Sequence, residues 1–336
     1  MTEVLTAEQY FGEIERIRKR IQNNPQYTCM CPSCNARPIH SHVFQKNGIL
    51  NKVAVNRKVY MFTFNHLFSV LANEPIVEYK LKGINDAFCF WGFCSDHDNK
   101  IFAHLEPANG MVNWYDTKTQ YLLAYRCICR ELSTHYDVKF ILMECIRTFN
   151  YDKNSAMNIA LQLSSRNNSI KVLNTYKSLF EDGIFNASFS KYTFKIIELP
   201  YYLELCVSAP IMIAEESAGL YFGPPKEEIG ETINVVNIFP YKRKTMIIMG
   251  FLKNKPNKWM NRIYEMLSSN NIKDICFALQ DILFRTEFHC ISTSLYDAIH
   301  SEIPLFIEEY IDNMSNFNNT LHYTSNLFYR YLTTNV

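Results

Sequence analysis

The sequence predicts an α+β fold: a zinc-binding unit near the N-terminus, a helical middle, and a C-terminal α+β unit with an antiparallel sheet. Three observations lead to this prediction. Cysteine and histidine gather in two close pairs within the first hundred residues, a helical period of apolar residues follows, and segments rich in Val, Ile, Tyr and Thr come last. At ~100–200 residues per domain, the 336 residues suggest two domains. We place them at 1–115 and 116–336, the second serving to sense a trigger or bind a target or partner.

The composition is that of a packed globular protein, with 48% hydrophobic and 20% charged residues. No apolar run approaches the ~20 residues of a membrane-spanning helix, so we expect no membrane association. The first twenty residues carry no basic leader followed by an apolar stretch, which predicts a cytoplasmic protein. The odd count of eleven cysteines then favours reduced thiols and metal ligands over disulfides, and the net charge of +1 gives no overall attraction for nucleic acid.

The N-terminal unit should begin with a helix. A capping box of Thr6 and Gln9 would start it, and its apolar stripe comprises Tyr10, Ile14, Ile17 and Ile21. Further on, β-branched and aromatic content predicts strands at 59–64 and 76–81, and the segment 88–107 reads as a strand, a turn and a short helix.

The second unit should be helical from about 120 to 180, where apolar residues recur with a helical period. Strands are expected within 191–214 and 233–252, with a loop at Gly223-Pro-Pro225 between them. Two further helices are predicted at 259–267 and 272–284.

Two pairs of residues suit one zinc ion, which takes four N or S ligands in a tetrahedron. The downstream pair is Cys94 and His97, whose two-residue spacer lets both point to one side at a helix start. The upstream pair is Cys34 with either Cys31, at the standard spacing, or Cys29, in a wider clip. The other cysteines lie on apolar stripes and are predicted to pack in the core: Cys89, Cys127, Cys129, Cys145, Cys206, Cys276 and Cys290.

The order of these motifs resembles the zinc-stapled members of the HNH, or ββα-metal, nuclease superfamily, over residues 29–106. The features that carry it are the knuckle at 29–34, the segment Ile39-His-Ser-His42-Val-Phe, and Cys94-x-x-His97-Asp98 opening a helix. The resemblance implies a treble-clef-like ββα unit with structural zinc, in which His42 is the general base and Asp98 holds a catalytic Mg²⁺ or Mn²⁺. Such chemistry needs a base near the attacking water and a cation at the phosphate.

Basic and aromatic residues also interleave in the C-terminal half, a pattern that suits phosphate contact and base stacking. A sheet edge protected by lysines is the alternative explanation. The candidate nucleic-acid-binding residues are Lys242, Arg243, Lys244, Lys255 and Lys258.

Two hypotheses follow. The first is a metal-dependent HNH-like endonuclease acting on DNA or RNA; by analogy alone, it would serve in bacterial phage defence or as a toxin. The second is a zinc-stapled module that binds nucleic acid or a protein partner, or forms a homodimer, without catalysis. Ser41 favours the second, because the family carries an acidic residue immediately before the base.

Overall fold

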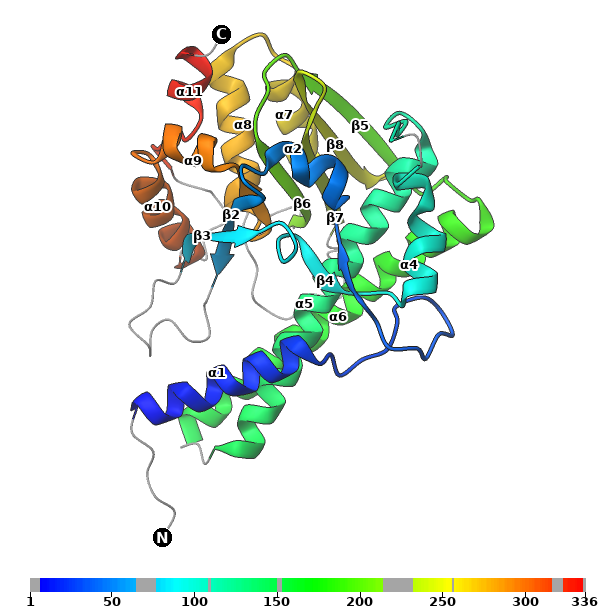
Figure 1. Cartoon of the computed structure of the whole chain (residues 1–336), viewed down its shortest axis with the longest axis vertical. Helices are drawn as coiled ribbons and strands as arrows, with labels where there is room; N and C mark the ends of the chain where they lie inside the picture. Colours follow the sequence, from blue (N-terminus) through cyan, green and yellow to red (C-terminus); the bar gives the residue numbers. More distant parts are fainter. Residues whose placement is uncertain are drawn as a thin grey trace.

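The structure, a computed structural model, is a mixed α and β fold with an antiparallel sheet, as the sequence predicts (Figure 1). It describes residues 7–64, 77–107, 110–149, 153–213, 232–255, 257–315 and 323–334. Two predicted features lie outside these residues: Thr6 of the capping box, and the loop at Gly223-Pro-Pro225.

Seven strands form the main sheet in the order β3-β2-β9-β6-β7-β8-β5, and every neighbouring pair is antiparallel. The strands are β2 (Lys58–Phe64), β3 (Val77–Gly83), β5 (Tyr192–Leu199), β6 (Leu205–Ile213), β7 (Thr232–Tyr241), β8 (Lys244–Leu252) and β9 (His289–Ile291). The predicted strand segments are thus confirmed, and β9 adds a short strand that the sequence analysis did not anticipate.

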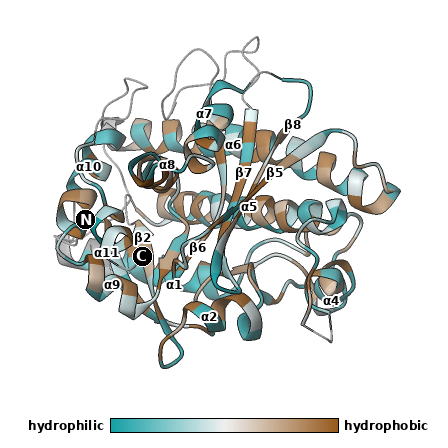
Figure 2. Ribbon diagram, turned by 90° about the horizontal axis from the view of Figure 1, so that it is seen from above, coloured by the Kyte–Doolittle hydropathy of each residue, from teal (hydrophilic) through white to brown (hydrophobic). Residues whose placement is uncertain are grey.

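The sheet is the middle of three layers. Nine of the ten residues of β7 are buried, so both of its faces are covered. Alternate residues belong to different cores: Val235 packs with residues of α5 (Thr117–Thr148), whereas Val236 packs with residues of α8 (Ile272–Phe284). Figure 2 shows the hydrophobic colour gathered along these central strands. Strand alternation therefore places one helical layer on each face.

The face opposite α5 is covered by five helices from the C-terminal part of the chain (Figure 1). These are α7 (Lys258–Leu267), α8, α9 (Thr293–Ile299), α10 (Ile303–Ser315) and α11 (Tyr329–Thr334). The predictions for 259–267 and 272–284 match α7 and α8 closely.

The other face carries α5, which pairs with α6 (Lys153–Asn186) in a long helical hairpin (Figure 1). Asp116 caps α5 by accepting a hydrogen bond from the backbone N–H of Thr119 at 3.0 Å. The N-terminal helix α1 (Ala7–Asn23) lies along the far part of α5, where Ile14, Ile17 and Ile21 pack against Ile141, Cys145 and Phe149. The predicted apolar stripe is thus the packing face of α1; the side chain of Tyr10 is outside the described part.

Residues 40–53 and 89–105 form a smaller unit beside this layer. Its elements are β1 (His40–His42), the π-helical turn η1 (Lys46–Leu50), α2 (Asn51–Val53), β4 (Cys89–Trp91), α4 (Ser95–Phe102) and the 3-10 turn η2 (Ala103–Leu105). β1 and β4 pair antiparallel, with His42 opposite Cys89. This two-stranded sheet and α4 form the short ββα arrangement that positions the candidate site.

The N-terminal region also supplies strands to the main sheet. β2 and β3, which lie in the segment between β1 and β4, pair with each other, and β2 pairs with β9 through Tyr60–Ile291 and Met61–Cys290. The two predicted units, 1–115 and 116–336, therefore share one sheet. No helix in the described ranges is both long enough and apolar enough to cross a membrane.

Candidate metal centre and the adjoining polar cluster

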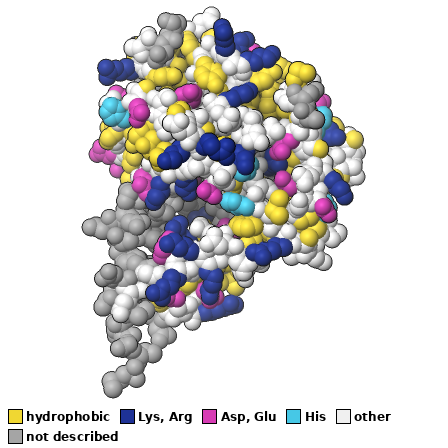
Figure 3. Space-filling model, in the orientation of Figure 1, with side chains coloured by type: hydrophobic (Ala, Val, Ile, Leu, Met, Phe, Trp, Pro, Cys, Tyr) yellow, Lys and Arg dark blue, Asp and Glu magenta, His cyan; other side chains and the backbone are white. Residues whose placement is uncertain are grey.

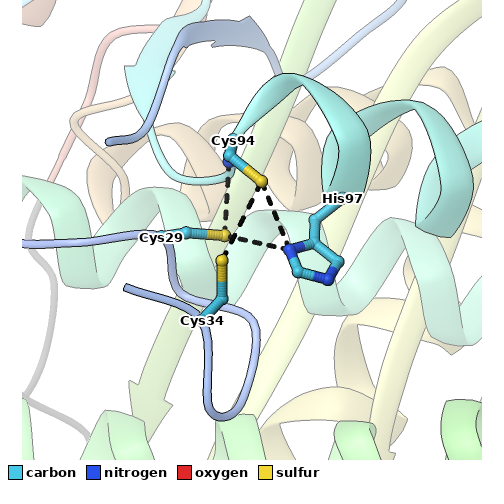
Figure 4. Close-up of side chains that lie close together, drawn as sticks. All are labelled: Cys29, Cys34, Cys94 and His97. Carbon is cyan, nitrogen blue, oxygen red and sulfur yellow. Dashed lines mark hydrogen bonds between the residues drawn. The ribbon is translucent and has the colours of Figure 1, made fainter. Parts of the chain in front are cut away.

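The first half of the metal centre is the knuckle between α1 and β1. The backbone N–H of Cys29 donates to the carbonyl of Ala36 at 2.9 Å, and that of Cys34 donates to Cys31 at 3.2 Å. Ser33 takes the left-handed conformation, with φ of 62°, which closes the tight turn before Cys34. The turn directs the sulfurs of Cys29 and Cys34 to the same side (Figure 4).

The second half is the start of α4. Cys94 occupies the N-cap position with extended backbone, and His97 lies in the first helical turn. Two backbone hydrogen bonds hold this corner against the knuckle, from Met30 to the Gly92 carbonyl at 2.8 Å and from Ile39 to the Phe93 carbonyl at 2.7 Å. Backbone hydrogen bonds therefore position both halves of the centre independently of the metal-ligand side chains.

The four side chains Cys29, Cys34, Cys94 and His97 converge on one point, with ligand atoms all within 4.8 Å of one another (Figure 4). The Cys29 Sγ lies 3.5 Å from His97 Nδ1, the Cys94 Sγ lies 3.3 Å from the same atom, and the two sulfurs of Cys34 and Cys94 are 4.0 Å apart. Tetrahedral zinc, with Zn–S of ~2.3 Å and Zn–N of ~2.0–2.1 Å, separates its ligand atoms by about 3.5–3.8 Å. The cluster therefore has the donor set and spacing to hold a structural metal ion.

The structure selects Cys29 over Cys31 as the fourth member of the cluster, an alternative that spacing alone left open. The Cys29 sulfur also accepts a hydrogen bond from the backbone N–H of Cys94 at 3.2 Å, which is typical of a metal-binding thiolate. Burial is the main influence on this thiol and raises its pKa to about 12 when no ion is bound.

His42, the predicted base, ends strand β1 and is partly buried. Its Nε2 lies 2.8 Å from the carbonyl oxygen of Ile84. Since a carbonyl can only accept, Nε2 carries the proton, and Nδ1 of the neutral ring keeps a free lone pair. Burial is the largest effect lowering the pKa of His42; the charges of Lys46 and Arg126 lower it further, and Glu106 opposes them. The ring is therefore neutral at pH 7 and available to accept a proton.

Asp98, the predicted cation ligand, faces α5 and pairs with Arg126, one of whose terminal nitrogens lies 3.3 Å from the carboxylate. The other terminal nitrogen of Arg126 pairs with Glu106 at 3.0 Å. The guanidinium also lies 4.1 Å from the ring centroid of Phe102, and its side chain is 2% exposed. One buried cation thus joins the start of α4, the segment after η2, and α5.

Arg126 is a functional candidate that sequence reasoning missed, and Glu106 was left without a role. The signal was an arginine between Tyr125 and Cys127, in the middle of an otherwise apolar helical stretch. A buried arginine is rare unless it is paired, so that position implied carboxylate partners. Their identity depended on the packing of α4 against α5.

The basic residues that were predicted to form one cluster lie at opposite ends of strand β8. Lys242 and Arg243 form the two-residue turn between β7 and β8, and Lys244 pairs with Glu198 at 2.6 Å. Lys255 and Lys258 follow the opposite end of β8, about 30 Å away at ~3.3 Å per residue. The five residues therefore belong to two separate surfaces.

Another basic surface lies on the face seen in Figure 3, where lysine and arginine side chains form a band across the middle of the molecule. The band covers the region of β2 to β4 in Figure 1. β2 and β3 carry Lys58, Lys80 and Lys82. The sequence analysis gave these lysines no role.

The remaining cysteines occupy the positions expected of core residues. Of the seven cysteines predicted to pack in the core, all are buried except Cys89, which is partly exposed; Cys31, outside the cluster, is also partly exposed. Cys206 and Cys290 lie directly opposite each other on β6 and β9. No two cysteines in the described part of the chain form a disulfide.

Comparison with known proteins identified no relative. No family model matches the chain, and neither the curated proteins nor the solved structures include a significant match. The functional assignment consequently depends on the geometry of the site.

Proposed function

We propose that Cys29, Cys34, Cys94 and His97 bind one zinc ion and that this ion has a structural role. Four protein ligands complete a tetrahedron and leave no open position for water or substrate, which distinguishes a structural from a catalytic zinc site. The ion would join the knuckle to the start of α4. It would thereby stabilise the two-stranded sheet of β1 and β4, which lies next to both. Zinc is preferred because three thiolates and one imidazole are soft and borderline ligands.

We further propose that the zinc-stapled unit hydrolyses phosphodiester bonds in nucleic acid, with His42 as general base. The observation that carries this is the orientation of His42, whose Nε2 donates to Ile84 and whose Nδ1 is left to accept a proton. In the proposed step Nδ1 takes a proton from water, the hydroxide attacks phosphorus, and the bond to the leaving oxygen breaks as solvent protonates that oxygen. The pairing of β1 with β4, followed by α4, also fits the resemblance to HNH-like nucleases, although β2 and β3 come between the two paired strands in the sequence.

Arg126 would supply positive charge in this site. Its positive charge lowers the pKa of His42, so the two groups interact electrostatically. Ion pairs with Asp98 and Glu106 hold the guanidinium in place. A buried guanidinium favours the negative charge that develops on phosphate oxygens more strongly than an exposed one, because fewer water molecules screen it.

The divalent cation implied by the resemblance has less support. The Asp98 carboxylate is engaged by Arg126, and within the described ranges the Cys29–His97 cluster is the only group of three or more candidate ligand residues. Asp98 remains the residue that would hold Mg²⁺ or Mn²⁺ through an oxygen. The proposed proton transfer does not depend on that ion.

A nuclease assay tests the proposal. Purified protein is incubated with plasmid DNA and with single-stranded RNA, each in Mg²⁺, Mn²⁺ or EDTA. We expect cleavage of one substrate by wild type and a loss of about 10²-fold or more in His42→Ala. The matched control is His40→Ala: this histidine lies two residues earlier on the same strand, but its ring packs against Trp91 at 5.2 Å. Absence of cleavage by wild type, or equal loss in both variants, would refute the assignment.

A second candidate is a binding module without catalysis. Ser41 stands where the resemblance implies an acidic residue, and its hydroxyl is buried without a hydrogen-bond partner among the described residues. Under this proposal Arg126, Asp98 and Glu106 would only stabilise the packing of α4 on α5. Retention of a labelled oligonucleotide with no cleavage under any metal condition would favour it. A role in phage defence or as a toxin remains a prediction by analogy.

A further inference from the structure

A cavity of about 270 Å³ lies beside the polar cluster. Its walls come from the chain after β1, the segment before α5, α5 itself and the turn between β7 and β8. The lining residues that matter here are Gln45, Lys52, Trp114, Arg126, Tyr241 and Lys242. The cavity thus lies where the zinc-stapled unit meets the main sheet.

Two residues that line this cavity each carry a buried N–H group without an acceptor among the described residues. Arg126 uses its terminal nitrogens for Glu106 and Asp98, but its Nε has no partner in the described part of the chain. The indole Nε1 of Trp114 is likewise unpaired, although the residue is only 6% exposed. Buried donors are usually paired, so two unpaired donors in one wall indicate an acceptor that the protein itself does not provide.

The charge of the lining is one-sided. Lys52, Arg126 and Lys242 line the cavity, and no lining residue is acidic. Because Asp98 and Glu106 already neutralise Arg126, the net positive charge of the lining comes from Lys52 and Lys242. The ammonium groups of Lys52 and Lys242 lie 5.8 and 5.1 Å from the ring centroid of Tyr241, which therefore brings two cations to the same edge of the cavity. Such a lining favours an anion.

The aromatic residues narrow the choice of ligand. Trp114 and Tyr241 form one wall, with ring centroids 6.4 Å apart and planes at 85°. Aromatic side chains beside cations are what a nucleotide requires, since its base stacks and its phosphate binds positive charge. A larger hollow nearby, of about 520 Å³, suits an anion less well because His104 and Asp116 in its wall pair with each other at 2.9 Å.

We propose that this cavity binds one nucleoside monophosphate unit, free or at the end of a strand. The phosphate would accept hydrogen bonds from Arg126 Nε and from Lys52 and Lys242, and the base would lie against Trp114 or Tyr241. The choice of a nucleotide rests on the proposed function, whereas the anion site rests on the unpaired donors and the lysines.

Isothermal titration calorimetry of the full chain tests this proposal, with 5′-AMP, 5′-UMP, adenosine and inorganic phosphate as probes at low and moderate salt. We expect AMP or UMP to bind at micromolar to millimolar concentration, adenosine to bind at least tenfold more weakly, and added salt to weaken the nucleotide. Failure of both nucleotides and of phosphate to bind at millimolar concentration would overturn the proposal. Binding of adenosine as tight as that of AMP would also overturn it.

Lysine variants test whether AMP binds in this cavity. Lys52→Gln and Lys242→Gln change exposed side chains and should preserve folding, so each is expected to weaken AMP binding by about threefold to tenfold. The control is Lys273→Gln, which removes the same charge from an exposed side chain of α8, on the other face of the sheet, and should leave binding unchanged. Equal effects in all three variants would indicate general attraction and contradict the proposal. Because the readout is binding, these outcomes are independent of whether His42 supports cleavage.

Discussion

The backbone N–H of Cys94 donates a hydrogen bond to the sulfur of Cys29 at 3.2 Å, across 65 residues of chain. Among the described residues, the metal-type cluster does not include Cys31. This bond aligns the Cys29 sulfur with the start of α4, and it explains why the wider clip, rather than the standard two-residue spacing, forms the cluster.

The first prediction concerns metal content. Purified protein should contain about one equivalent of zinc by elemental analysis, and Cys29→Ser should lose it, because zinc binding supplies much of the folding energy of such units. Cys31→Ser, in the same knuckle, should keep it. Loss of zinc in both variants, or a folded wild type without metal, would contradict the ligand set.

The second prediction concerns the contribution of Arg126 to stability. Arg126→Met should lower the free energy of unfolding by about 3–5 kcal/mol, because Asp98 and Glu106 would lose a buried partner. Urea denaturation followed by circular dichroism measures this. On the same helix, Arg147 is 70% exposed and pairs with Glu144 at 3.7 Å, so Arg147→Met should cost less than about 1 kcal/mol. Similar losses in the two variants would show that the Arg126 pairs are not buried ion pairs.

A third prediction follows from the lowered pKa of His42. A general base must be unprotonated, so cleavage should fall as the pH drops through this pKa, with the acidic limb below the ordinary value of 6.5. The positive charge of Lys46 contributes to the lowering. Lys46→Gln should therefore move the limb to higher pH by about a few tenths of a unit. A pH–rate profile with its limb above 6.5, or unmoved in this variant, would argue against His42 as the base.

The fourth prediction is a pH dependence of stability. Burial raises the pKa of Asp137, on α5, to about 7, and one of its carboxylate oxygens has no hydrogen-bond partner among the described residues. The folded state therefore binds a proton that the unfolded state releases near pH 4, so this residue makes the protein less stable as the pH rises from about 4 to 7. Asp137→Asn should stabilise the protein by up to about 4 kcal/mol at pH 8 and change it little at pH 4. Urea midpoints at both pH values provide the test; an equal shift at both would contradict it.

Much of the fold was predictable because it depends on local patterns. The apolar period gave α8 at its observed bounds, and β-branched content marked β2 and β7. The short strand β9 was missed because three residues between a helix and a turn carry no measurable period. It is a strand because β2 and β6 provide backbone partners on both of its sides.

The candidate site likewise contains residues that local sequence patterns predict and residues that only the tertiary structure brings together. Cys34, Cys94 and His97 were predicted because a turn and a helix start fix their spacing within a few residues. The ion pair between Asp98 and Arg126 was not predicted, because Arg126 lies 28 residues further along the chain and contacts Asp98 only through helix packing.

By itself, the sequence determined three of the four candidate metal ligands, the helices and most strands, because each depends on contacts within one turn or on the alternation of one strand. Tertiary structure decided that Cys29 completes the cluster, that β2 and β3 join the main sheet, and that Arg126 pairs with Asp98 and Glu106. These relationships arise when distant segments bury a shared surface, and the burial of Arg126, which forces it to find carboxylate partners, exists only once α4 has packed on α5.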